Sequence, residues 1–216
     1  MRTLFFAAAA LALAFAHAQT ATFIGNCAFK FQLGEATLYT DFPYQSGFFN
    51  NNTYPPEALQ GLSGTTLITH EHLDHLDPSL LPSKGLQVIS PTQEQGVRDK
   101  VIAELGERSG IYVYPISTPH ADVPHFSYIV QWNRRRMFFS GDTDDPKELL
   151  SAQNIDVAFI TPKLLAAVNA TGRKIDARTV IIYHHKTGEL DSKELQAPCD
   201  CKMTVPQQGD VIRLFR

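Results

Sequence analysis

One segment indicates the fold and the kind of site to expect in the rest of the chain: Thr65-Thr66-Leu67-Ile68-Thr69-His70-Glu71-His72-Leu73-Asp74-His75-Leu76-Asp77-Pro78. Its first half has the β-branched and apolar residues of a strand, and its second half offers three histidines and a carboxylate in a loop. Side chains two positions apart on an extended backbone point to the same side. We therefore expect His70 and His72 to bind one cation together, and Asp74 and His75 to reach a second cation beside it.

The residue types in this loop favour a metal site. Imidazole nitrogen and carboxylate oxygen suit zinc, and they also suit iron or manganese. A single loop histidine is usually a solvated residue, but three within six positions directly after a strand indicate metal binding. The helical HExxH pattern does not apply, because it needs a histidine at position 74, where this chain has Asp74.

The segment resembles the HxHxDH signature of the metallo-β-lactamase superfamily. The resemblance implies an α/β fold, a four-layered αββα sandwich, and further ligand motifs that follow in a fixed order. Two of them are recognisable after predicted strands. A loop with His120 and His125 follows 111–116, and Ser140-Gly141-Asp142-Thr143 follows 137–139.

The resemblance assigns these motifs to a metal centre. It favours His120 as the next ligand, with His125 as the competitor or as a residue that supports a ligand or contacts substrate. Asp142 resembles the superfamily's bridging aspartate, whose carboxylate holds two cations close together. Asp144 and Asp145, followed by Pro146, are interpreted instead as the start of a helix.

The last ligand motif follows the predicted strand at 180–183. The resemblance favours His185 as the ligand, and His184 remains the alternative or a candidate for substrate contact. Near the N-terminus, Asp41 resembles an aspartate that orients a ligand histidine or its loop, although an aspartate in a turn before Pro43 is the alternative.

The histidines of the chain support one centre. Apart from His17, every histidine lies in the clusters 70–75, 120–125 or 184–185. The resemblance implies two ions, zinc in the first place, with iron or manganese as alternatives. One ion would be held by His70, His72 and His120, the other by Asp74, His75 and His185, with Asp142 between them.

We predict a metal-dependent hydrolase that uses a metal-bound hydroxide on an ester, lactone, amide or phosphoester of a small molecule. Asp142 and Asp74 are the predicted catalytic carboxylates. The bridging Asp142 argues against β-lactam hydrolysis, and the opening Gly25-Asn26-Cys27-Ala28-Phe29 resembles the UlaG-type lactonase and hydrolase branch. The alternatives are a non-catalytic metal- or ligand-binding protein and a di-iron redox enzyme, the latter disfavoured because His72 is present and no flavodoxin-like domain fits.

The N-terminus has the features of a secretory signal peptide. A short basic start precedes the apolar run 4–15, and Ala16-His17-Ala18 forms an A-x-A cleavage site. The run is short for a transmembrane helix, so a retained anchor is the minor alternative. We predict a signal peptide at 1–18, one hydrolase domain at 19–216, and a periplasmic or secreted protein without stable membrane insertion.

Composition limits the partners. The formal net charge is −3, and the only basic cluster is Arg134-Arg135-Arg136 at an expected hairpin turn. We interpret it as a solvated turn and predict no nucleic-acid partner. The sequence leaves the oligomeric state open. Two of the three cysteines could pair in an oxidising compartment, and the sequence leaves the pairing open. It favours Cys27 with Cys199 or Cys201, because a Cys199–Cys201 bridge would close a very small ring.

The remaining elements are expected from local patterns. Strands at 21–24, 28–33 and 36–41 form a β-meander. Helices are predicted from Asp77-Pro78, over 91–105 with Gly106 ending it, and near 191–196. The aromatic loop 44–56 could place Phe48, Phe49 and Tyr54 as a wall over the site or in the core.

Overall fold

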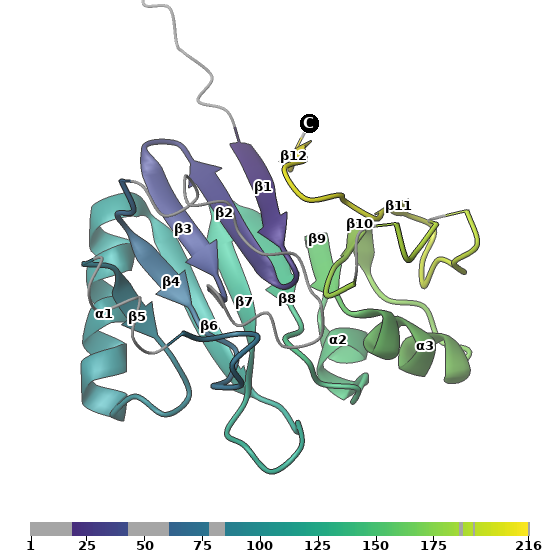
Figure 1. Cartoon of the computed structure of the whole chain (residues 1–216), viewed down its shortest axis with the longest axis horizontal. Helices are drawn as coiled ribbons and strands as arrows, with labels where there is room; N and C mark the ends of the chain where they lie inside the picture. Colours follow the sequence, from purple (N-terminus) through teal and green to yellow (C-terminus); the bar gives the residue numbers. More distant parts are fainter. Residues whose placement is uncertain (1–18, 43–60, 78–84, 186–187, 192, 216) are drawn as a thin grey trace, which may run out of the picture.

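The computed structural model describes residues 19–42, 61–77, 85–185, 188–191 and 193–215. The predicted signal peptide, the aromatic loop at 44–56 and the helix expected from Pro78 lie outside these residues. Twelve strands and three helices are present in the described part of the chain. The strands form two sheets that face each other (Figure 1).

The first sheet contains the predicted meander. Its strands run in the order β12-β1-β2-β3-β4-β5, with antiparallel pairing from β12 to β3 and parallel pairing from β3 to β5. The β1–β2–β3 meander is confirmed. The bounds are β1 Gln19–Gly25, β2 Ala28–Leu33, β3 Ala36–Thr40, β4 Thr65–Leu67, β5 Gln87–Ile89 and β12 Val211–Arg213.

The second sheet runs in the order β11-β10-β9-β8-β7-β6. Strands β8 to β11 are parallel, and β6, β7 and β8 are joined as antiparallel neighbours. The bounds are β6 Ile111–Ser117, β7 Phe126–Trp132, β8 Arg135–Phe139, β9 Ile155–Ile160, β10 Ala177–Ile182 and β11 Lys202–Thr204.

The helices are α1 Gln95–Ser109, α2 Lys147–Ser151 and α3 Pro162–Ala170. Helix α1 closes one side of the sandwich by packing against the edge strands β5 and β6 (Figure 1). It runs past Gly106, the predicted end, and stops at Gly110, which has the left-handed φ of +65° of a C-terminal cap. Helix α2 starts directly after Asp144-Asp145-Pro146, as expected, but its N-cap residue is Pro146 and no side chain caps it. Asp145 accepts a hydrogen bond from the Lys147 amide.

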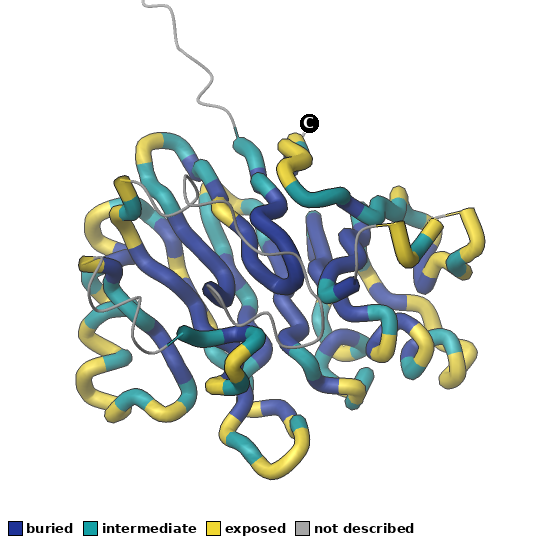
Figure 2. Tube along the Cα trace, viewed as in Figure 1, coloured by how far each residue is buried: buried dark blue, intermediate teal, exposed yellow. Residues whose placement is uncertain are grey.

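Two apolar layers hold these elements together. Between the sheets, Phe29, Phe31, Phe139 and Phe159 pack with ring centroids 4.7 to 5.8 Å apart. On the outer face of the second sheet, residues of α2 and α3 pack against Phe138, Ile160 and their neighbours. The strands accordingly form the buried centre in Figure 2. The predicted α/β sandwich is confirmed, and helix α3 was not predicted.

Two predictions near the C-terminus are wrong. Cys199 and Cys201 form a disulfide with a Cα–Cα distance of 5.2 Å, whereas Cys27 is a buried free thiol. A bend at Asp200 brings the two cysteines together, so the small ring closes within normal Cα spacing. The described residues of 191–196 form turns, not a helix. No described helix is long and apolar enough to cross a membrane.

Candidate metal centre

The histidine clusters meet at one end of the sandwich. Strands β4, β8 and β10 end there, and each is followed directly by a segment with predicted ligands: 70–75, 140–142 and 184–185. The β6–β7 connection brings His120 and His125 to the same end. Because the carboxyl ends of parallel strands share one edge of a sheet, segments far apart in sequence converge there.

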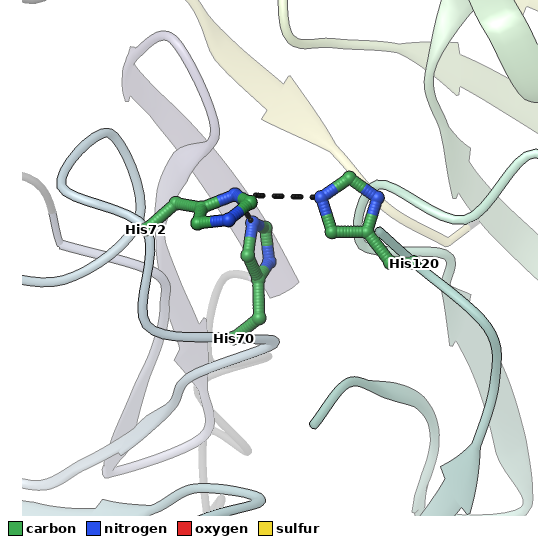
Figure 3. Close-up of side chains that lie close together, drawn as sticks. All are labelled: His70, His72 and His120. Carbon is green, nitrogen blue, oxygen red and sulfur yellow. Dashed lines mark hydrogen bonds between the residues drawn. The ribbon is translucent and has the colours of Figure 1, made fainter. Parts of the chain in front are cut away.

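Three imidazoles form the first group (Figure 3). Nδ1 of His72 lies 3.0 Å from Nε2 of His70 and 3.4 Å from Nε2 of His120. His70 is fully buried, while His72 and His120 are half-buried and leave one side open. The structure thus brings together the three histidines that were assigned to one ion.

The second group combines imidazoles and carboxylates. Nε2 of His184 lies 3.2 Å from Nε2 of His75 and 3.3 Å from Oδ2 of both Asp74 and Asp142. Nε2 of His75 is also 3.3 Å from Oδ2 of Asp142. A further close group of ligand atoms contains His70, His75 and Asp142. Asp142 therefore lies between the two groups, where a bridging ligand would be needed.

The spacing of these atoms fits metal ligation. Two nitrogens that each lie about 2.05 Å from a tetrahedral zinc are separated by about 3.3 Å. The distances within both groups cluster around this value, although pairs such as His72–His120 and His75–His184 are far apart in sequence. Oδ1 of Asp142 is buried and has no hydrogen-bond partner among the described residues, an environment that fits a bound cation.

His184, and not the favoured His185, lies in the second group. Strand β10 ends at Ile182, and His184 then adopts a left-handed φ of +61°. This backbone reversal turns the His184 ring into the second group and leaves the buried His185 ring 6.0 Å from the ring of Phe23. The strand pattern located the pair, but it could not predict the reversal that selects one of them.

Asp41 has the position expected of a residue that orients a ligand. Its Oδ2 lies 3.0 Å from Nδ1 of His75, and its Oδ1 accepts a hydrogen bond from the Thr69 amide at 2.7 Å. Asp41 is 1% exposed. A carboxylate on Nδ1 holds the proton there and leaves Nε2 of His75 available to a metal. Asp41 thus fixes both the ring of His75 and the backbone that leads into His70.

His125 supports Asp142 from behind. The Asp142 amide donates to Nε2 of His125 at 2.9 Å, so the ring proton must reside on Nδ1, which lies 2.8 Å from Oγ1 of Thr118. Thr118 contacts the Ser127 hydroxyl, and that hydroxyl donates to the Ser140 carbonyl at 2.7 Å. This chain of hydrogen bonds begins and ends on the turn that carries Asp142. It commits both nitrogens of His125, which argues for His120 as the ligand.

A turn that was not predicted as part of the site clamps two of its segments. Nδ2 of Asn26 and Sγ of Cys27 donate to the Asp74 carbonyl at 3.0 and 2.9 Å. The Asn26 carbonyl accepts the His184 amide at 2.8 Å. Asn26 also has a positive φ of 50°, which asparagine tolerates well. Its signal in the sequence was the Gly-Asn pair between two predicted strands, which reads only as a hairpin turn.

The electrostatics of the centre follow from burial and from the mixture of charges. Burial lowers the pKa of His70, and it lowers the pKa of His125 to about 4, so both rings are neutral. Burial alone would raise the pKa of Asp142, but His75 and His184 beside it lower that pKa below its usual value. Burial raises the pKa of the Cys27 thiol to about 12, which makes it a weak nucleophile at neutral pH.

Comparison with known proteins identifies the fold. No family model matches the chain, and no curated protein matches it at significance. Solved structures do match. The metallo-beta-lactamase fold protein YhfI from Bacillus subtilis is 12% identical, with a TM-score of 0.59 over 90% of this chain and 99% of that one. Igni18, a metallo hydrolase from Ignicoccus hospitalis, is 15% identical, with a TM-score of 0.53 over 90% and 97%.

A third neighbour has a different chemistry. CmlA, a diiron beta-hydroxylase from Streptomyces venezuelae, is 13% identical, with a TM-score of 0.54 over 92% of this chain and 54% of that one. At these identities the comparisons establish the fold: the chain has the metallo-β-lactamase fold, which the sequence motif indicated. The neighbours include metal-dependent hydrolases. They do not single out the UlaG-type branch.

Proposed function

We propose that this protein is a metal-dependent hydrolase with a centre for two metal ions. The observation that carries the proposal is the position of Asp142, whose carboxylate lies within reach of His70 on one side and of His75 and His184 on the other. A structural histidine cluster does not require a carboxylate between its two halves, but a pair of neighbouring cations does.

The residues of the centre would bind two ions and balance their charge. His70, His72 and His120 would bind one ion, and Asp74, His75 and His184 the other, with Asp142 between them. When bound, the ions would lower the pKa of a coordinated water and polarise the substrate's oxygen. The carboxylate of Asp142 would offset the charge of the ions, and the Asp74 carboxylate is the candidate proton acceptor.

The ligand set favours zinc. Five imidazoles and two carboxylates form a nitrogen-rich set, and zinc readily accepts imidazole in four-coordinate sites. The substrate would be a small molecule with an ester, lactone, amide or phosphoester bond. Iron and redox chemistry are the second candidate, because the diiron hydroxylase CmlA shares the fold. A protein that only binds metal or ligand is the third.

Metal content and turnover test the proposal together. Elemental analysis of protein purified without chelator should find about two zinc ions per chain. The His72→Ala variant should lose metal and all hydrolysis of a panel of nitrophenyl esters, lactones and bis-nitrophenyl phosphate. Glu71→Gln is the matched control, since Glu71 lies between two ligands but hydrogen-bonds Thr92. Two iron ions would favour the redox candidate, and less than one ion after zinc is supplied would favour the binding protein.

We also propose that the mature protein works outside the cytoplasm. The signal-like segment 1–18 supports this, and the Cys199–Cys201 disulfide suits an oxidising compartment. Mass spectrometry of the protein from a bacterial periplasmic fraction should give an N-terminus at Gln19. Protein retained in the cytoplasm with Met1 intact would contradict this localisation.

A further inference from the structure

A basic cleft lies at the opposite ends of the strands that carry the metal centre. Its cationic residues are Arg135 at the start of β8, Arg178 at the second position of β10, Lys202 on β11 and Arg213 on β12. The cleft has a volume of about 410 Å³. Residues of β11 and of β12, which belong to different sheets, line the cleft, so both sheets contribute to its walls. Because Arg178 and His184 are six residues apart on and after β10, roughly 20 Å of strand separates this basic cleft from the metal centre.

The basic cleft holds more positive charge than its own carboxylate can offset. Among the described residues that line it, Asp156 is the one acidic residue, against four cations. Its Oδ1 already pairs with Arg135 at 2.9 Å and with Arg178 at 3.3 Å, and its Oδ2 accepts the Arg136 amide. In the described part of the chain, Lys202 and Arg213 make no ion pair. The whole protein has a net charge of −3, so this local excess is not a general property of its surface.

Some of the residues that line the basic cleft are held in place by contacts with one another. The guanidinium of Arg135 lies over the ring of the buried Phe215, 5.5 Å from its centroid, and Asp156 holds its other side. Lys202 pairs in register with Thr179, whose side chain also lines the cleft together with Thr204. Two residues with hydroxyl groups and four with cationic N–H donors therefore line one concave space.

We propose that the basic cleft binds a phosphate group of a small phosphorylated molecule or of a lipid headgroup. A phosphate offers three acceptor oxygens and up to two negative charges, which match converging guanidinium, ammonium and hydroxyl donors. Arginine is suited to this contact because its planar fork can donate two parallel hydrogen bonds. The proposal does not depend on the hydrolase assignment, and it gives a role to Arg135, which the metal centre leaves unused.

Titration with inorganic phosphate tests the proposal directly. Calorimetry in low-salt buffer should detect binding, and an R178A/K202A double variant should weaken it about tenfold, the loss expected from one or two charge-assisted contacts. The matched control is K100A/R173A, which removes two positive charges at exposed positions outside the cleft. Equal binding in wild type and R178A/K202A would overturn the proposal, and so would equal weakening in the control.

Phosphate can also bind at a metal centre, so the two proposals must be separated. Binding at the basic cleft should persist in His72→Ala, whereas phosphate bound at the proposed metal centre should be lost there. Sedimentation with phosphatidylcholine vesicles, with and without phosphatidylglycerol, distinguishes the sources: retention on the anionic vesicles indicates a headgroup, and phosphate binding alone indicates a soluble molecule. Much tighter binding of an oligonucleotide, lost in R178A/K202A, would replace the proposal with a nucleic-acid surface.

Discussion

The two ends of strands β8 and β10 differ in how firmly their charged and polar residues are held in place. At the carboxyl ends, Asp142 and His184 are partly buried and are held from behind by backbone and side-chain hydrogen bonds. At the amino ends, Arg178 is 75% exposed at its side chain and is held by one ion pair. The difference is one of positional precision, because a metal ligand must be fixed to within fractions of an ångström, whereas a solvated cation attracts an anion over a wide range of positions.

The largest effect is expected at the residue that links the two ligand groups. Asp142→Ala should reduce metal content from about two ions to one or none and lower hydrolysis by roughly a thousandfold or more, because the carboxylate offsets the charge of both ions. Elemental analysis and initial rates measure these changes. Asp144→Ala, an exposed neighbour, is the control. A variant with full metal content and activity would show that Asp142 does not bridge.

The next effect is expected from crowding behind Asp142. A Cβ at Gly141 would lie 2.3 Å from Nε2 of His125, and Gly141 has a φ of +58°. Gly141→Ala should therefore destabilise the protein by about 2–4 kcal/mol, from backbone strain and overpacking together. Urea unfolding without metal measures it. Gly172→Ala has a similar φ of +67° but open space, so it should cost only about 1 kcal/mol. Equal losses would mean that His125 moves away freely.

A smaller effect is expected where a carboxylate orients a ligand. Asp41→Asn keeps the size of the side chain but can place an NH₂ against the Nδ1–H of His75, which favours the wrong tautomer. Metal affinity should fall about 10- to 100-fold, as measured by competition with a chelator. The control Asp176→Asn changes an exposed aspartate away from the centre, so this variant should keep the zinc affinity of the wild type. An unchanged affinity in Asp41→Asn would contradict the orienting role.

The smallest effect is expected at the exposed end. Arg178→Ala should change the free energy of unfolding by less than about 0.5 kcal/mol, because an exposed ion pair is screened by water and Asp156 keeps Arg135 as a partner. Chemical denaturation measures it. A loss above about 1 kcal/mol would mean that the basic cleft is a structural network and would weaken the contrast between the two ends.

The parts of the site that the sequence could predict are those encoded by local spacing. His70 and His72 are separated by one residue after a strand, and Asp142 follows a strand and a glycine, so their direction is set by the adjacent backbone. His184 and His185 could not be separated in this way, because the choice depends on a backbone reversal held by the Asn26 carbonyl, which is 158 residues distant in sequence. The disulfide was mispredicted for a related reason, since the burial of Cys27 depends on the packing of the first sheet.

The sequence by itself determined the meander strands, the histidine clusters and the order of the ligand segments, because alternating apolar residues and ligand spacings are local properties of the chain. The sandwich was implied by the resemblance of these motifs to the metallo-β-lactamase superfamily. Only the tertiary structure decided which imidazoles meet, that Asp41 and His125 are committed to orienting their neighbours, and that Arg135 shares a cleft with Arg213. Those relations join residues on different strands and sheets. Their distances are set by strand order and packing, which no spacing along the chain records.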